Sequence, residues 1–539
     1  MNIAFLAVNC SYSHSSLASW CLHAALPREG NWNWHTIEVT VKDAPQTVIE
    51  LVLASQPQVV AASLYLFNRH FVIELLALIR SRAPECLIVV GGPECLGDNR
   101  ALVVPAGPAD AALRGEGERA FPELLRRLAA GVDWRNIPGL CTAGLLQEYR
   151  DNGVAEELSS LDTIPTFYRR ELAGFMKPFI QLETSRGCSN GCLFCTSRQT
   201  TIRTHSLERI RSDLHDIQQA GVREVRIVDR TFNEEHGRAM LLTSLFRDEF
   251  PAIRFHLEID PARFGEALAR EFSKAEAGQF HIEAGIQSLN QAVYDVIERK
   301  ASVARTLDGL RRLCALRNVE VHVDLIAGLP GGTRQGLADD LHTIIALEPA
   351  EIQLERLKLL PGTPLAESPV KWGLIASPSP PYQVMRTMGM TPDDLGYADQ
   401  LSKVLDWFYN QESLRASVTG GVRTIPSFLD ELTRRVGERA GFAVCPNLED
   451  RFLILDAVLE GELRDRLRYR WYGLGFSTRH GPCPSEPWKT AIPDGAVLVE
   501  GDASVRVSRM VRVDLATPHL FCYGTGPAGE RAVVAVYRL

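Results

Sequence analysis

Short apolar segments alternate with amphipathic helical segments through the first 370 residues, and this alternation strongly limits the fold. In the first part of the chain the apolar segments lie at residues 3–8, 36–41, 59–66 and 87–90. Strands that are apolar on both faces and separated by helices are typical of a doubly wound parallel sheet. We therefore expect an α/β protein whose first domain, residues 1–145, is Rossmann-like.

A second series of strands and helices follows a linker over residues 146–175, where Pro165 favours extended geometry in the preceding residue. The predicted strands are at residues 224–228, 254–259, 281–287, 320–327 and 352–360. Repeated βα units of this length predict a full or partial TIM-type barrel over residues 176–370. Functional residues of such barrels gather at the carboxyl ends of the strands.

Residues 371–539 combine an amphipathic helical pattern with a valine-rich alternating pattern near the end of the chain. This combination predicts an α+β extension. It contains no metal-ligand spacing or nucleophile motif, so its role stays open.

Composition excludes several classes of partner. The net charge is −8, which argues against a broad electrostatic surface for nucleic acid. No run of about 18 apolar residues suggests a membrane span. The twelve cysteines show no disulfide-scaffold pattern, which fits a reducing compartment, and we expect a cytoplasmic protein.

Three cysteines, Cys188, Cys192 and Cys195, stand in a CxxxCxxC spacing after an apolar segment. Three thiolates can ligate three irons of a [4Fe-4S] cluster and leave the fourth iron open to a small molecule. The alternatives are a zinc site, which prefers four closed ligands, and three unrelated core cysteines.

This triplet, with Phe194 before its last cysteine, resembles the motif of the radical S-adenosylmethionine (SAM) enzymes. The resemblance implies that the open iron chelates SAM, which the reduced cluster cleaves to methionine and a 5'-deoxyadenosyl radical. It also implies that Phe194 packs near the adenine.

Three predicted strand ends in the first domain are rich in small or polar residues. They are Ser63, Leu64 and Tyr65; Gly91 and Gly92; and Gly115, Glu116, Gly117 and Glu118. Ligands of doubly wound sheets bind at such ends, and the fold alone would equally suit a flavin or a nucleotide. In this order, ahead of the cysteines, they resemble the cobalamin-binding domain of cobalamin-dependent radical SAM enzymes, which makes them expected cobalamin contacts.

The Asp-x-His-x-x-Gly motif that supplies a histidine ligand to cobalt in some cobalamin domains is missing here. His14 lies near the corresponding place, but its serine neighbours also suit a helix N-cap. Tyr65 and Asn68 are further candidates for the lower face of the cobalamin.

In the second domain, residues 228–233 resemble the Asp-Asp-Thr-Phe-Asn signature of the same enzymes, with Arg230 in place of the second aspartate. The resemblance implies SAM or substrate contacts at the polar residues and turns of successive strands. These are Asp229, Thr231, Asn233, Glu258, Glu283, Gln287 and Gly328. The alternatives are an ordinary Asx turn for the residues after Asp229, internal ion pairs for the polar strand residues, and a purely structural turn for Gly328.

The resemblance covers residues 1–370 and implies an enzyme with three cofactors, a [4Fe-4S] cluster, SAM and cobalamin. The first expectation is methylation of an unactivated carbon through methylcobalamin. A cobalamin-dependent cyclisation or rearrangement is the alternative, and a non-catalytic cobalamin or redox sensor is a more remote one. The expected partners are a small-molecule or peptide substrate and an electron donor such as flavodoxin or ferredoxin.

Overall fold

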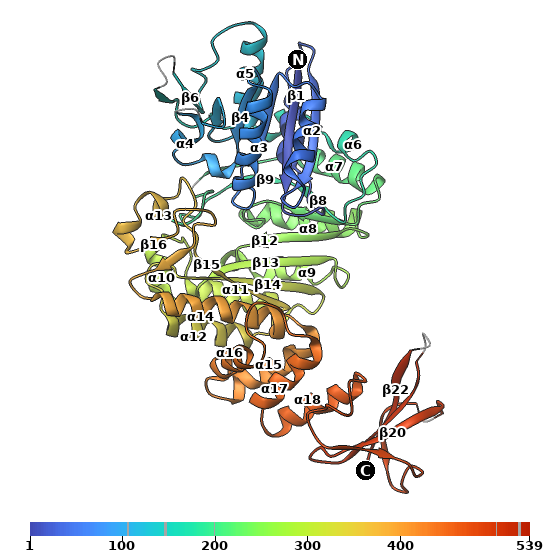
Figure 1. Cartoon of the computed structure of the whole chain (residues 1–539). Coiled ribbons are helices and arrows are strands. Elements are labelled where there is room, and N and C mark those ends of the chain that lie inside the picture. The colour runs from blue at the N-terminus through green and yellow to red at the C-terminus, as the bar shows by residue number, and fades with distance from the viewer. Residues whose placement is uncertain (105–106, 145–147, 199, 503, 527–529) are drawn as a thin grey trace. The chain divides into compact units, whose positions relative to one another are not determined.

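The computed structural model describes residues 1–104, 107–144, 148–198, 200–502, 504–526 and 530–539. The chain forms two compact units (Figure 1). The first comprises Met1–Leu337 and Arg356–Leu395, and the second comprises Ala338–Glu355 and Gly396–Leu539.

The first sheet of the first unit has the strand order β2-β1-β3-β4-β5-β6-β7. Its strands are β1 (Asn2–Asn9), β2 (Asn33–Thr40), β3 (Val59–Ser63), β4 (Leu87–Gly91), β5 (Ala111–Leu113), β6 (Leu140–Ala143) and β7 (Tyr149–Asp151). The first five in this order are parallel, and β6 and β7 add antiparallel strands at one edge. The order 2-1-3-4-5 is that of flavodoxin-like sheets, which bind ligands at the carboxyl edge between β1 and β3.

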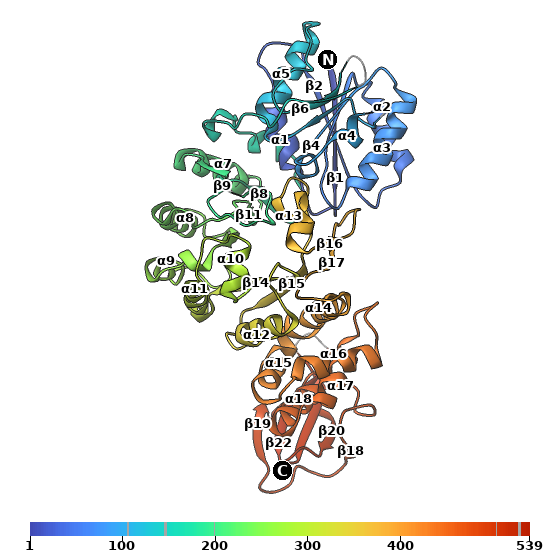
Figure 2. The same cartoon turned by 90° about the vertical axis from the view of Figure 1, so that its left-hand side faces the viewer.

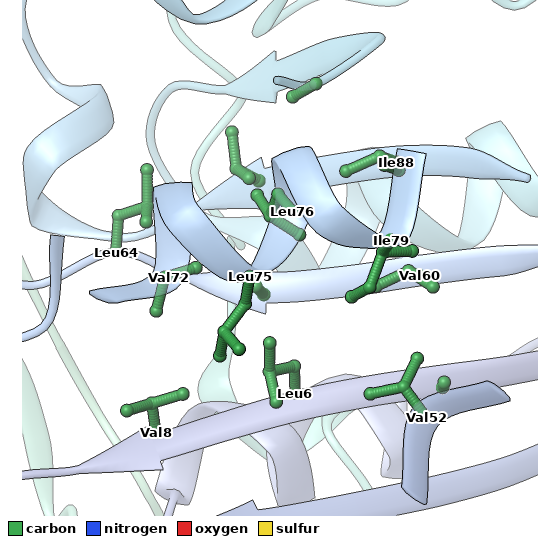
Figure 3. Close-up of a cluster of buried hydrophobic side chains, with 14 of the residues drawn as sticks. Leu6, Val8, Val52, Val60, Leu64, Val72, Leu75, Leu76, Ile79 and Ile88 are labelled. Carbon is green, nitrogen blue, oxygen red and sulfur yellow. The ribbon is translucent and has the colours of Figure 1, made fainter. Parts of the chain in front are cut away.

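Helices cover both faces of this sheet (Figure 2). They are α1 (Leu17–Ala24), α2 (Pro45–Ala54), α3 (Arg69–Arg82), α4 (Arg100–Val103) and α5 (Gly117–Ala129). Successive strand residues point to opposite faces. Leu6 of β1 therefore packs with Leu75 of α3 in the cluster of Figure 3, whereas the adjacent Phe5 packs with Phe121 of α5.

The second sheet of the first unit contains five parallel strands in the order β14-β13-β12-β11-β8. They are β8 (Ile180–Leu182), β11 (Glu224–Ile227), β12 (Arg254–Ile259), β13 (Phe280–Gln287) and β14 (Val319–Ala327). The strand expected over residues 352–360 is observed as β15 (Glu351–Arg356). The expected α/β class is confirmed. The first sheet is doubly wound and mainly parallel, and the second is an open parallel sheet, so the partial and not the full barrel is observed.

Shorter elements and helices complete this part of the chain. They are α6 (Tyr168–Glu171), β9 (Ser185–Cys188), β10 (Thr200–Thr204), α7 (Leu207–Gln219), α8 (His236–Glu249), α9 (Glu266–Phe272), α10 (Gln291–Val296), α11 (Val303–Ala315), α12 (Arg334–Ile345), α13 (Pro364–Glu367), β16 (Ile375–Ala376) and β17 (Val384–Arg386). Strands β9 and β10 pair as an antiparallel hairpin that ends at Cys188, the first of the three cysteines.

The second unit combines helices with a five-stranded antiparallel sheet of order β18-β20-β21-β22-β19. Its elements include α14 (Pro392–Val404), a π-helical turn over Leu405–Tyr409, α15 (Glu412–Thr424), α16 (Phe428–Arg439), α17 (Leu448–Val458), α18 (Gly461–Gly473), β18 (Ser485–Trp488), β19 (Val497–Gly501), β20 (Val507–Val513), β21 (His519–Thr525) and β22 (Arg531–Arg538). Trp471 and Tyr472 of α18 are fully buried, so both rings pack in the core of this unit.

Leu75→Ala tests the packing between α3 and the first sheet. Leu75 is fully buried, and we expect the change to lower the free energy of unfolding by about 2–5 kcal/mol because a cavity remains. Hydrogen exchange of the β1 and β3 amides measures this loss. Leu51→Ala on α2 is the control, since Leu51 is 52% exposed, and an equal loss in both variants would contradict the packing.

Candidate active site

The three cysteines of the CxxxCxxC motif line one cavity at the carboxyl ends of the second sheet. Cys188 and Cys192 are buried, and the backbone turns tightly between Cys192 and Cys195, whose amide donates to the Cys192 carbonyl at 3.1 Å. The described lining includes no fourth cysteine. Three soft sulfur donors around one cavity fit a [4Fe-4S] cluster with an open iron and lack the four closed ligands of structural zinc.

A rigid hairpin positions Cys188. Its amide donates to Thr200 Oγ1 at 3.1 Å, and Cys188 pairs with Thr200 across β9 and β10. Gly187 has φ +113°, and a Cβ there would lie 2.3 Å from the Thr201 carbonyl oxygen. Only glycine fits this backbone conformation and close approach.

Asp229 anchors the start of the hairpin and does not line the cavity as it is described. Its buried carboxylate accepts the backbone amides of Thr184 at 2.7 Å and Ser185 at 2.9 Å. It also accepts both hydroxyls of these residues, at 2.5 and 2.6 Å. All of these contacts come from the protein, so the geometry gives Asp229 a structural role and leaves the expected SAM contact a prediction.

Asn233 has a structural role like that of Asp229. Its side-chain oxygen accepts the Asp260 amide and its side-chain nitrogen donates to the Asp260 carbonyl, both at 2.9 Å. It thereby fixes Asp260, which does line the cavity. Thr231 also lines the cavity, and its hydroxyl oxygen lies 3.7 Å from Cys188 Sγ.

Three carboxyl groups from neighbouring strands meet in the cavity: Glu258, Glu283 and Asp324. Burial raises the pKa of Glu258 to about 7, although the Arg230 charge opposes this shift. Burial also raises the pKa of Asp324, to about 6. The hydrogen bond with His256, at 3.0 Å, holds the pKa of Glu283 below its ordinary value. The cavity therefore contains two carboxyl groups whose pKa values are raised by burial beside one whose pKa is lowered by a hydrogen bond.

Arg299 is a cavity residue that no sequence motif identified. Its guanidinium donates to the Gly285 carbonyl at 2.6 Å. Burial raises the pKa of the Cys192 thiol to about 11, and the Arg299 charge is the main opposing effect. A buried cation beside a cysteine favours its thiolate form, which is the form that ligates iron.

Further lining residues were not expected as ligand contacts. They are Asn190, Ser197, Arg198, Arg230, Ile259, Asp260 and Gly285. Asn190 Oδ1 is buried and lacks a hydrogen-bond partner within the described parts of the chain, which suits a ligand donor. Arg230 is exposed.

Phe194 and Gln287 line the cavity as expected, and Gln287 adopts a left-handed conformation with φ +69°. Gly328 does not contribute to the described lining. It has φ +87°, and a Cβ there would lie 3.1 Å from Leu395 Cδ2, so local packing accounts for the glycine.

At the carboxyl edge of the first sheet, packing between the strand ends accounts for one of the expected glycines. A Cβ on Gly92 would lie 2.7 Å from the Leu64 carbonyl oxygen. Leu64 is fully buried, and its amide donates to the Gly91 carbonyl at 2.7 Å. Contacts of Ser63, Leu64, Gly91 and Gly92 with cobalamin stay predictions.

Aromatic rings are exposed near the ends of β1 and β3. Tyr12 is 68% exposed, and Phe67 is 48% exposed and stacks on Tyr65 with ring centres 5.5 Å apart. Such surface fits a large planar corrin ring. Asn68 is fully buried, and its side-chain amide hydrogen-bonds to backbone atoms only. It accepts from the Tyr65 amide and donates to the Val8 and Ser63 carbonyls, which argues against a role as cobalt ligand.

His14 lies in the loop after β1, where Ser11 Oγ is 2.9 Å from its Nδ1. The helix cap is Ser16, whose side chain accepts the Ser19 amide, so His14 is a loop residue. Glu116 and Glu118, two further expected cobalamin contacts, form ion pairs with arginines near the cysteine loop.

Comparison with known proteins agrees with this geometry. The B12 binding domain family matches residues 3–125, and the radical SAM superfamily matches residues 182–344. These matches define a two-domain class in which a B12 binding domain precedes a radical SAM domain. The chain therefore contains a B12 binding domain and a radical SAM domain, as the sequence resemblance implied, and these domains support the expected cofactor set: a [4Fe-4S] cluster, SAM and cobalamin.

Two curated relatives are named methyltransferases. The hopanoid C-3 methylase of Methylococcus capsulatus is 29% identical over 50% of this chain and 53% of its own. The cobalamin-dependent radical SAM methyltransferase TokK of Streptomyces tokunonensis is 26% identical over 63% of this chain and 52% of its own. The chain thus spans about half the length of these relatives.

Two solved structures share the fold. The cobalamin-dependent S-adenosylmethionine radical enzyme OxsB aligns over 87% of this chain and 83% of its own, with a TM-score of 0.61 and 15% identity. The radical SAM methyltransferase TsrM of Kitasatospora setae aligns over 73% and 80%, with a TM-score of 0.56 and 17% identity. Within the described residues, no helix is both long and apolar enough to cross a membrane.

Alanine at Cys188, Cys192 or Cys195 tests the cluster site. Each change removes one of three sulfur ligands, so we expect the reconstituted protein to lose most of its bound iron and sulfide, measured together with its EPR spectrum. Cys445→Ala is the control because Cys445 is exposed and lies outside the cavity lining. Full iron binding by Cys192→Ala would contradict the site.

Glu258→Gln tests the raised pKa. The native pKa of about 7 exceeds the ordinary 4.5, so the native state holds more protons than the unfolded state between these values. Its stability therefore falls as pH rises through this window and then levels off. The glutamine variant should lack this fall and be more stable above the window by up to about 3 kcal/mol. Denaturant unfolding of cluster-free protein at several pH values measures the difference; parallel pH profiles would contradict it.

Proposed function

We propose that this protein is a cobalamin-dependent radical SAM enzyme that methylates an unactivated carbon. The observation that carries the proposal is the cavity with three cysteines at the carboxyl ends of a parallel sheet, in a chain that also has a B12 binding domain. The names of two relatives, a hopanoid C-3 methylase and a radical SAM methyltransferase, support methyl transfer.

Cys188, Cys192 and Cys195 would hold the cluster, and the carboxyl edge of the first sheet would hold cobalamin. When bound, the cluster and SAM supply a carbon radical by way of a 5'-deoxyadenosyl radical, and cobalamin supplies a methyl carrier. The remaining work belongs to the protein, which orients these groups and limits access of water.

The polar lining suits the methionine part of SAM. Asp260 is held by Asn233 and could accept a hydrogen bond from an ammonium group, and the unpartnered Asn190 Oδ1 could do the same. Arg230 offers a cation for a carboxylate on the same side of the sheet as the cysteines. Phe194 supplies an aromatic face for adenine.

One observation favours a second reaction, a cobalamin-dependent cyclisation or rearrangement. Glu258 has a pKa of about 7, which is suited to a group that takes up and releases a proton at neutral pH. A radical methylation of a saturated carbon needs no proton transfer at the substrate, whereas a rearrangement that gains or loses a proton does.

We infer a small-molecule or peptide substrate, an electron donor such as flavodoxin or ferredoxin, and a reducing cytoplasmic setting. The donor follows from the need to reduce the cluster before SAM is cleaved. None of the twelve cysteines forms a disulfide, which supports the reducing setting.

Anaerobic reconstitution with iron, sulfide and hydroxocobalamin, followed by reductant and SAM, tests the proposal. We expect bound cobalamin and both 5'-deoxyadenosine and S-adenosylhomocysteine, with at least about a 100-fold loss of deoxyadenosine in Cys192→Ala, because the radical step needs the cluster. Chromatography measures both products.

5'-Deoxyadenosine without S-adenosylhomocysteine would favour rearrangement. Cofactor binding without SAM cleavage would favour the sensor function over catalysis. Cys445→Ala serves again as the matched control, and equal deoxyadenosine yields in it and in Cys192→Ala would contradict radical chemistry at this site.

A further inference from the structure

The Gly-Glu-Gly-Glu turn of the first domain reaches the hairpin that carries Cys188. Glu116 pairs with Arg203 of β10 at 2.6 Å and with Arg186 of β9 at 3.4 Å. Glu118 pairs with Arg186 at 3.0 Å. Glu183, just before the hairpin, completes the set with a contact of 2.8 Å to Arg186. We name these five residues the interdomain ion-pair cluster.

The cluster is largely shielded from solvent. Its side chains are 21% exposed at Arg186, 8% at Arg203, 15% at Glu116, 9% at Glu118 and 17% at Glu183. Exposed ion pairs contribute little, but a buried pair that loses one partner leaves an uncompensated charge. Breaking this cluster should therefore be costly.

The carboxylates of the turn are already occupied by the protein. Glu116 accepts two bonds from Arg203, at 2.6 and 2.9 Å, and the Leu158 amide at 3.0 Å. Burial raises the pKa of Glu116, but these bonds outweigh burial and hold it below its ordinary value. Gly115 also serves the protein: it has φ +99°, and a Cβ there would lie 3.2 Å from the Ala155 backbone nitrogen.

The hairpin transmits this contact to the cysteine loop. Arg186 and Arg203 are cross-strand partners, and Arg186 stands two residues before Cys188. At Gly187 the backbone lies so close to Thr201 that no larger residue fits. A short strand pair of this kind has little freedom to tilt without moving Cys188.

The hairpin is thus held at two places. Asp229, at the end of β11, binds the Thr184 and Ser185 amides from the second sheet. The interdomain ion-pair cluster binds Arg186 and Arg203 from the first domain. The second anchor is the one that ties the cysteine loop to the domain with the B12 binding fold.

We propose that Glu116 and Glu118 are positioning residues that fix the Cys188 hairpin to the B12 binding domain, and that they do not bind cobalamin. The Gly-Glu-Gly-Glu turn then has a structural role, although its sequence pattern predicted contacts with cobalamin. The proposal rests on the cluster site of the proposed function and is independent of whether the reaction is methylation or rearrangement.

Glu116→Gln and Glu118→Gln test the proposal in the full-length protein. Glu156→Gln is the matched control, since Glu156 pairs with Arg119 at 2.9 Å near the same turn, but both side chains are more than half exposed. The first measurement is hydrogen exchange of the β9 and β10 amides in cofactor-free protein. The other measurements are thermal unfolding, cobalamin binding and the EPR spectrum of the reduced, reconstituted cluster.

We expect hydrogen exchange of the hairpin amides to become at least about tenfold faster in both test variants, because fewer contacts then have to break before the hairpin can open. The EPR spectrum should change, and SAM cleavage should fall by about 10-fold to 100-fold through kcat, since small displacements of reacting groups have effects of this size. Cobalamin affinity and the control variant should stay at wild-type values.

Loss of cobalamin binding with unchanged hairpin exchange would overturn the proposal and favour cofactor contacts for the turn. A lower unfolding midpoint with an unchanged EPR spectrum and unchanged hairpin exchange would also overturn the proposal. That result would mean that the two glutamates stabilise the whole protein and do not position the hairpin. If a glutamine variant does not fold, Glu116→Asp keeps the charge but shortens the reach to Arg203, and it should give intermediate exchange. The exchange readout needs no cofactor or substrate, so its failure is distinguishable from failure of the proposed function.

Discussion

The active-site cavity depends on the strict alternation of side chains along the central strands of the second sheet. In β12, Phe255 and Leu257 are fully buried against helices, whereas His256 and Glu258 between them point to the other face. The same alternation in β13 and β14 places Glu283 beside Glu258 and brings Asp324 into the same cavity. A shift of one residue in register would turn all of these carboxyl groups into the apolar core, so register and chemistry are fixed together.

Burial of so many polar groups is costly unless they pair, and the pairing determines which of them can serve a ligand. The side chains of Asp229 and Asn233 form hydrogen bonds with backbone atoms, so they hold the segments that carry Ser185 and Asp260. Within the described residues Glu258 accepts no such set of hydrogen bonds, and burial raises its pKa. Neighbouring polar residues thus divide into those that build the cavity and those that face it.

The fold and the cluster site could be predicted from sequence because both leave local signals. Apolar periodicity marks the strands, and the spacing of Cys188, Cys192 and Cys195 marks the three sulfur groups that line the cavity. The direction of a polar side chain leaves no such signal: Asp229 and Thr231 stand in one motif, yet only Thr231 lines the cavity. Arg299 follows α10 outside any motif, so only the tertiary structure brings it to Cys192.

Glycine-rich turns show the same limit in another way. Sequence identifies that a Cβ is excluded at Gly92, but it cannot identify what excludes it, and here it is the Leu64 backbone. A glycine required by the fold and one required by a ligand have the same pattern. The two can be separated only by what occupies the space of the missing side chain. At the turn that contains Glu116 and Glu118, Val154 and Ala155 lie where a Cβ on Gly115 would stand, and arginines of the hairpin bind the carboxylates. The position of the cysteine loop is therefore a property of both domains, because the first domain supplies one of the two contacts that hold it.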